Sequence, residues 1–257
     1  MSILILALIF NFIGSVLSLI GGVLLLIKEK RMLKISHLLA SFAAGSLLGA
    51  TFFDLLPEAA HGSQDSNTDI FLWTLVGFLF FFLLERFLHW FHHHDGHHGH
   101  MAEDAKPIIP LIVVGDSIHN FIDGVAIATT FLISVPLGIV TTLAVAAHEI
   151  PQEIGDFALL LHKGVKKWNV LLINLFSAAT SILGVLIVFT VGEKAEGILP
   201  ILLSLTAGFF LYIAASDLIP EIHHENRKGF ALFESLLLIL GVLVIWLTVN
   251  SLSGFGI

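Results

Sequence analysis

Runs of about 20 apolar residues recur along nearly the whole chain, and each is long enough to cross the hydrocarbon core of a bilayer as a helix. Hydrophobic residues make up 56% of the 257 residues and charged residues only 12%, too few to cover the surface of a soluble domain of this length. We therefore predict an all-α, polytopic membrane protein with eight transmembrane helices, at residues 3–27, 36–60, 70–91, 108–133, 137–161, 168–192, 197–221 and 230–252.

The basic residues predict the orientation of these helices. In an eight-helix alternation, eleven of the twelve lysine and arginine residues fall on one side of the membrane, and only Lys194 falls on the other. The positive-inside rule makes the first side cytoplasmic, so both termini face outward. The eleven residues are Lys28, Lys30, Arg31, Lys34, Arg86, Lys106, Lys163, Lys166, Lys167, Arg227 and Lys228.

A five-residue motif occurs twice, near the ends of the second and seventh predicted helices. It reads Asp54-Leu55-Leu56-Pro57-Glu58 in one and Asp217-Leu218-Ile219-Pro220-Glu221 in the other. Because these helices run in opposite directions, we predict that helices 1–3 and 6–8 form an inverted repeat flanking helices 4 and 5, as is typical of transporters. The acidic residues of the motif either attract cations at the two mouths of a pathway or only mark the lipid–water boundary.

Polar residues gather in the middle of the fourth and fifth predicted helices. The fourth carries the run from Asp116 to Gly124, and the fifth carries the run from His148 to Asp156. An ionisable group at this depth costs roughly 2.5–3.5 kcal/mol on insertion scales, so its presence indicates a function. One or two such groups usually join helices through hydrogen bonds. So many on two consecutive helices, with a histidine at matching depth on each, favour a metal or ion pathway.

The spacing of these residues predicts how they meet. Residues three and four apart share a face of a helix, so Asp116, His119 and Asp123 form one stripe. His148 with Gln152 forms a second stripe, and Glu149 with Glu153 forms a third beside it. If the two helices face each other, imidazoles, carboxylates and amides converge. A mixed nitrogen and oxygen set suits zinc, and also iron(II), manganese, cobalt or cadmium.

These two runs resemble the signatures of the ZIP (Zrt/Irt-like protein) metal transporter family. His119-Asn120-Phe121-Ile122-Asp123-Gly124 is similar to its fourth-helix motif, and His148 to Asp156 is similar to the fifth-helix motif His-Glu-x-Pro-His-Glu-x-Gly-Asp. The resemblance covers essentially the whole chain. It implies that the metal is bound by His119, Asn120, Asp123, His148, Glu149 and Gln152, with Glu153 and Asp156 in support.

Two positions depart from the family pattern. Gln152 stands where one large subgroup has histidine and other members have glutamate, and a neutral amide is a weaker zinc ligand. Ser181 stands where members with a two-metal centre have a glutamate in the sixth helix. The first departure affects affinity or the choice of metal, and the second argues against a full second metal site.

The predicted cytoplasmic loop between the third and fourth helices, residues 92–106, is rich in histidine. Seven of the fourteen histidines lie between residues 89 and 104. Such a tract binds metal weakly, so we expect an accessory role in receiving metal or sensing its level. The alternative interpretation is a solvated polar linker.

We therefore expect residues 1–257 to form a single transmembrane transporter domain in the plasma (cell inner) membrane, carrying Zn²⁺ or a related divalent ion into the cytoplasm. We expect no cofactor, enzyme activity or nucleic-acid partner. The partners are divalent metal ions and the lipid bilayer, and the sequence leaves a homodimer open. Two alternatives are an intramembrane zinc metalloprotease, since residues 148–152 nearly spell His-Glu-x-x-His, and a haem-binding electron carrier with His119 and His148 as axial ligands.

Overall fold

The computed structural model describes residues 2–64, 68–93, 108–192, 198–223 and 230–253, and within these ranges the chain forms helices and no strand. This part of the chain confirms the all-α prediction, and from residue 70 onward the predicted spans agree with the observed helices to within a few residues. The elements are α1 (Ile3–Ala50), η1 (Thr51–Leu55), α2 (Leu56–Gly62), α3 (Ile70–His93), α4 (Ile108–Ile133), α5 (Val135–His162), α6 (Lys167–Gly192), α7 (Leu199–Tyr212), η3 (Ile213–Leu218), α8 (Ile219–His223) and α9 (Phe230–Ser253).

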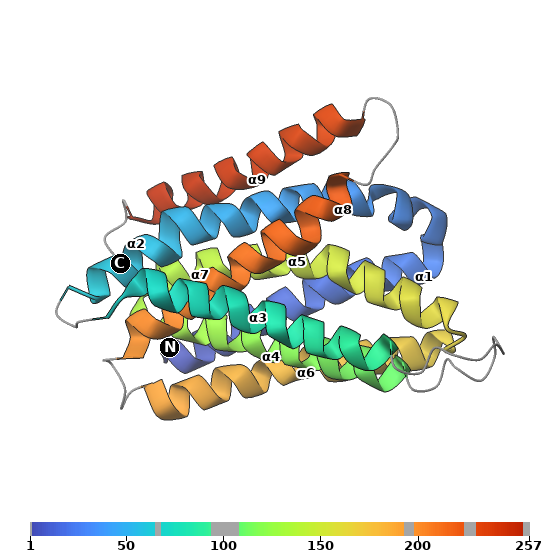
Figure 1. Cartoon of the computed structure of the whole chain (residues 1–257), viewed down its shortest axis with the longest axis horizontal. Helices are drawn as coiled ribbons and strands as arrows, with labels where there is room; N and C mark the ends of the chain where they lie inside the picture. Colours follow the sequence, from blue (N-terminus) through green and yellow to red (C-terminus); the bar gives the residue numbers. More distant parts are fainter. Residues whose placement is uncertain (1, 65–67, 94–107, 193–197, 224–229, 254–257) are drawn as a thin grey trace.

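The first two predicted spans form one continuous element, α1, with a sharp bend at Lys28. The backbone of Lys28 leaves the helical region (φ −134°, ψ 50°), and the two halves of α1 run in opposite directions (Figure 1). The bend coincides with the charged run from Lys28 to Arg31, which is expected to stay in the polar zone outside the hydrocarbon. The chain therefore turns at charged residues, which stay in contact with water.

The helices run back and forth along the long axis of the molecule (Figure 1). Six described segments are long and apolar enough to cross a membrane, and α4 and α5 are not among them. Those two helices carry the mid-span histidine and acidic residues. The apolar segments together support a multi-pass membrane protein, whereas the count of eight crossings stays a prediction.

The two copies of the Asp-Leu-x-Pro-Glu motif adopt the same local structure. Each aspartate, Asp54 or Asp217, lies in a short π-helical segment, η1 or η3, and the proline follows in the first turn of the next α-helix, α2 or α8. A π-bulge widens a helix by one residue, and proline cannot donate the hydrogen bond of a regular helix interior. The sequence repeat is therefore also a repeat of backbone geometry.

Three helix pairs approach closely at glycine residues. A Cβ at Gly124 of α4 would lie 1.9 Å from the Ser181 carbonyl oxygen of α6, and one at Gly184 would lie 2.3 Å from that of Phe121. The same reciprocal arrangement joins Gly77 of α3 to Gly208 of α7. It also joins Gly45, in the second half of α1, to Gly241 of α9. Small residues at such crossings let helix backbones come together in a membrane.

The helices fall into two packed groups. The first half of α1 lies against α5, where Gly22 meets the buried ring of Phe157, and α4 lies against α6. The second half of α1 packs on α9, and α3 packs on α7. The first group contains both helices that carry the polar runs.

Candidate metal centre

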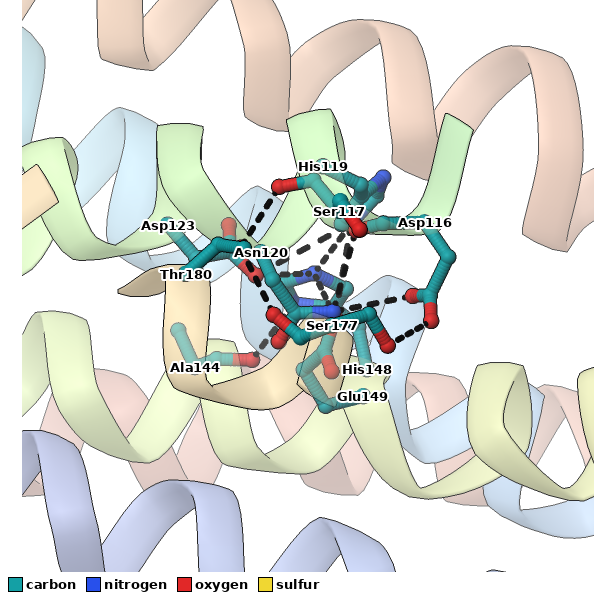
Figure 2. Close-up of polar contacts among 10 residues, drawn as sticks. All are labelled: Asp116, Ser117, His119, Asn120, Asp123, Ala144, His148, Glu149, Ser177 and Thr180. Atoms are coloured by element: carbon teal, nitrogen blue, oxygen red, sulfur yellow. Dashed lines mark hydrogen bonds and ion pairs between the residues drawn. The ribbon is translucent and has the colours of Figure 1, made fainter. Parts of the chain in front are cut away.

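Four buried side chains meet between α4 and α5 in the middle of the bundle (Figure 2). His119 and Asp123 come from α4, and His148 and Glu149 come from α5. One candidate ligand atom from each residue lies within 4.8 Å of every other, and all four side chains are buried. The structure thus brings together four of the six predicted ligands.

The separations between the imidazole nitrogens and the other facing atoms of this cluster are close to those of ligands around a metal. The Nε2 atoms of His119 and His148 are 3.2 Å apart. The His119 Nε2 atom lies 3.8 Å from Asp123 Oδ2 and 3.5 Å from Glu149 Oε1, and the His148 Nε2 atom lies 3.4 Å and 3.9 Å from the same oxygens. Zinc–ligand bonds of about 2.0–2.1 Å in a tetrahedron place neighbouring ligand atoms about 3.3 Å apart.

Helix geometry explains why these residues meet. His119 and Asp123 are four residues apart and lie on one face of α4, whereas His148 and Glu149 are adjacent and flank the line along which α5 faces α4. Asp116 belongs to the same stripe of α4, but it does not join the four. Its carboxylate accepts hydrogen bonds from Asn120 and from Ser177 of α6 instead.

A backbone carbonyl sets the state of one imidazole. The Nδ1 atom of His148 lies 3.2 Å from the Ala144 carbonyl oxygen, which can only accept a hydrogen bond. The proton of the neutral ring is therefore on Nδ1, and the lone pair of Nε2 points to the cluster. Such partners hold metal-binding histidines in the required orientation. Ring contacts with Phe81 of α3 and Phe210 of α7 complete an apolar wall around the two histidines.

Two carboxylate oxygens in the cluster lack hydrogen bonds. Asp123 Oδ2 and Glu149 Oε1 are buried and have no hydrogen-bond donor among the described residues. A buried charged oxygen without a donor or counter-ion is costly, especially at membrane depth. A bound cation would remove that cost, and it would do so at the atoms that face the two imidazole nitrogens.

Gln152 faces a larger cavity that reaches the cluster from one end of the bundle. The cavity has a volume of about 430 Å³ and is lined near the cluster by His119, Gln152 and Phe81. Farther out it is lined by Leu33 and Ser36 just after the bend of α1, and by four carboxylates, Glu85, Asp156, Asp217 and Glu221. The described residues that line this cavity are acidic or neutral, and they include no lysine or arginine.

Asn120 faces a second, much smaller cavity on the other side of the cluster. Its volume is about 10 Å³, and Asp123, Glu149, Asn11 and Ser181 also line it. The Asn11 Nδ2 atom donates to Ser181 Oγ at 2.9 Å, and Asn11 is 2% exposed. Ser181, the residue that departs from the family pattern, therefore pairs with a neutral amide of α1 beside the two cluster carboxylates.

Comparison with known proteins decides the family. A family model for the ZIP zinc transporters matches residues 1–110 and 104–248, which together span most of the chain. This chain belongs to the ZIP family. The expected resemblance is thereby confirmed, and the bounds of the match include every described helix that carries a candidate ligand.

Several relatives of this ZIP chain are named zinc transporters. Zinc transporter ZIP13 of Pongo abelii is 34% identical over 226 residues, which cover 80% of this chain and 64% of that protein. ZIP13 of Mus musculus is 33% identical over 248 residues, covering 80% of this chain and 68% of that protein. ZIP4 of Mus musculus is 42% identical over 124 residues, covering 48% and 19%. The chain thus spans only part of the length of these relatives.

Membership of the ZIP family favours the transport interpretation over the two alternatives. These relatives are named as transporters and not as proteases or electron carriers. The geometry agrees for the protease, because the second histidine of a His-Glu-x-x-His zinc site is Gln152 here. The chain therefore belongs to a family of named transporters, which favours the transport interpretation.

Sequence reasoning missed one part of this ZIP site and left others open. Asn11, a single amide in the middle of the first apolar run, could have been singled out because a polar group at that depth needs a partner. Glu153 and Asn174 are buried, and their side-chain carboxylate and carbonyl oxygens have no hydrogen-bond partner among the described residues. The histidine-rich segment 94–107 lies outside the described residues, so its accessory role stays a prediction.

Proposed function

We propose that this chain carries a divalent transition metal ion, Zn²⁺ in the first place, across the membrane into the cytoplasm. The supporting observation is the buried cluster of His119, Asp123, His148 and Glu149, in which each imidazole Nε2 atom lies 3.2–3.9 Å from the other imidazole and from the two carboxylate oxygens. Two imidazole nitrogens and two carboxylate oxygens form a donor set that zinc accepts and that Ca²⁺ and Mg²⁺, which prefer oxygen alone, do not. Fe²⁺, Mn²⁺, Co²⁺ and Cd²⁺ remain candidate substrates.

The two remaining predicted ligands would complete the site from opposite sides. Asn120 adjoins Asp123 and Glu149 across the small cavity, and Gln152 adjoins His119 in the larger one. We assign Asn120 a direct role as an oxygen ligand and Gln152 the handover of the ion to the larger cavity. Neutral amides hold zinc less strongly than imidazole or carboxylate, which suits a site that must also release its ion.

The larger cavity is the proposed exit path of the ion. It leads from His119 to Leu33, Ser36 and Glu221, at the end of the bundle where α1 bends at Lys28. The positive-inside rule assigns this end to the cytoplasm. We infer that the structure represents the state in which the site is connected to the cytoplasm. The carboxylates of Glu85, Asp217 and Glu221 then attract the departing cation.

The packing of the helices supports a proposal for alternating access. We propose that helices 1–3 and 6–8 form an inverted repeat around α4 and α5, supported by the shared π-helical geometry of Asp54 and Asp217. The group that bears the site, α4 and α5 with α6 and the first half of α1, would rock against the group of α3, α7, α9 and the second half of α1. The ion moves when the cluster opens alternately to the two faces.

The test is zinc uptake into sealed proteoliposomes that contain a zinc-sensitive dye. Wild type is expected to show saturable uptake, and Asp123→Asn is expected to lose it because one carboxylate of the cluster becomes a neutral amide. The matched control is Asp69→Asn, the same change at an exposed residue that caps α3. Correctly inserted wild-type protein that carries none of the five ions would reject the proposal. Equal uptake by Asp123→Asn would reject the site.

A further inference from the structure

Helix α6 contributes no member of the four-residue cluster, yet one buried carboxylate connects it to that cluster. Asp116 of α4 is 8% exposed, and its Oδ2 atom accepts a hydrogen bond from the Ser177 hydroxyl of α6. Its Oδ1 atom accepts one from Asn120 Nδ2 at 2.8 Å. The same nitrogen also donates to the Asp116 backbone oxygen at 3.1 Å (Figure 2). A chain of contacts therefore runs from Ser177 through Asp116 to Asn120.

These contacts fix which end of the Asn120 amide is available. An amide has one end with two donors and one end with an acceptor oxygen. Both hydrogen bonds of the Asn120 side chain are made by its nitrogen, so the oxygen is the end left for other partners. Asn120 borders the small cavity together with Asp123 and Glu149. Only the oxygen can bind a cation, because the nitrogen of an amide carries donors and no free lone pair.

We propose that Asp116 is a positioning residue of the metal site: it holds the Asn120 amide so that Oδ1, and not Nδ2, is presented to the metal, and Ser177 anchors Asp116 in turn. The proposal rests on the proposed metal site. A carboxylate suits this task, because both of its oxygens accept hydrogen bonds. An ionised carboxylate has no proton to donate, so it pairs with the amide nitrogen and not with the amide oxygen.

A purely structural role for Asp116 explains less. The interface of α4 and α6 is already joined by the Thr180 hydroxyl, which donates to the Ser117 carbonyl oxygen at 2.6 Å, and by the reciprocal glycine contacts of Gly124 and Gly184. A further buried carboxylate is not needed to hold the helices together, and it is costly at this depth. Its position one helical turn from the candidate ligand Asn120 indicates a role in the metal site.

The experiment measures Zn²⁺ affinity of the purified, detergent-solubilised chain by competition with a zinc dye. Asp116→Asn is expected to weaken binding on the order of tenfold or more, as loss of an outer-shell partner typically does. Asn120→Ala is expected to weaken binding similarly. In the double variant, Asp116→Asn should cost nothing beyond Asn120→Ala, because Asp116 acts only through Asn120. Thr180→Val, which removes a neighbouring α4–α6 hydrogen bond, should leave the affinity unchanged.

Each other outcome has a definite meaning. Wild type without zinc affinity would reject the metal site itself. An unchanged affinity in Asp116→Asn would overturn the positioning role. A double variant whose fold-loss of Zn²⁺ affinity equals the product of the two single losses would also overturn it. If Asp116→Asn does not fold, Ser177→Ala replaces it in the comparison of the single variants with the double variant. It keeps the Asp116 carboxylate but removes its anchor on α6, so it should weaken binding only when Asn120 is present.

Discussion

At the scale of single residues, the cluster depends on a few atoms whose charge and orientation are set by near neighbours. The Ala144 carbonyl orients His148, and the Asp116 carboxylate holds the nitrogen of Asn120. The family resemblance predicted six ligands, and helix periodicity explains how four of them come to lie close together. The direction in which the Asp116 side chain points was not predictable, since the sequence of α4 does not reveal that Ser177 of another helix lies within hydrogen-bond reach.

Acid is expected to slow zinc uptake even without a pH gradient. A metal requires neutral imidazoles and ionised carboxylates, so protons compete with it, and binding weakens as the pH falls. The measurement is the initial rate of uptake into proteoliposomes with the same pH on both sides, compared between neutral and mildly acidic buffer. A rate that rises with acidity under these conditions would contradict direct competition at the histidines.

At the scale of helices, close crossings at glycine determine how deeply the site is enclosed. Gly124 adjoins Asp123 in sequence, and its contact with the Ser181 backbone brings α6 against the helix that carries two of the four cluster residues. The positions of the helices were predictable from apolar runs and charged turns. Which helices cross, and at which glycine, depends on surfaces that meet only after folding.

Gly124→Ala is expected to lower the thermal stability of the chain. The added Cβ would lie 1.9 Å from the Ser181 carbonyl oxygen, so α4 and α6 must separate, and overpacking of this kind costs about 1–3 kcal/mol. Gly155→Ala is the matched control, because a Cβ there meets no atom within 4 Å. The measurement is the melting temperature of the detergent-solubilised variants. Equal melting temperatures would show that the α4–α6 crossing is looser than described.

At the scale of the whole molecule, the predicted orientation and the larger cavity support the same proposed direction of transport. The positive-inside rule predicts that the end of the bundle near the bend of α1 is cytoplasmic, and the acidic cavity leads from the cluster to that end. The mirrored π-helical segments at Asp54 and Asp217 lie in oppositely directed helices, as an inverted repeat requires (Figure 1). Orientation, pathway and repeat thus form one consistent arrangement.

The orientation can be measured directly, because the chain has no cysteine. Gln64 and Lys166 are exposed residues in turns that the eight-helix arrangement places on opposite sides of the membrane. In intact cells, Gln64→Cys is expected to react with a membrane-impermeant maleimide, whereas Lys166→Cys reacts only after the cells are permeabilised. The reverse pattern would invert the topology and the inferred direction of transport. Labelling of both in intact cells would show that the count of crossings is wrong.

The sequence by itself determined the class of protein, the approximate positions of the helices and six candidate ligands, four of which meet in the structure. Apolar runs, charged turns and helical spacing are local properties, and a bilayer turns them into strong constraints. The tertiary structure decided which cavity each of Asn120 and Gln152 faces, how Asn11 reaches Ser181, and that Asp116 turns to α6. Such contacts join residues up to 170 positions apart. They depend on the rotation and crossing of packed helices, which no local pattern specifies.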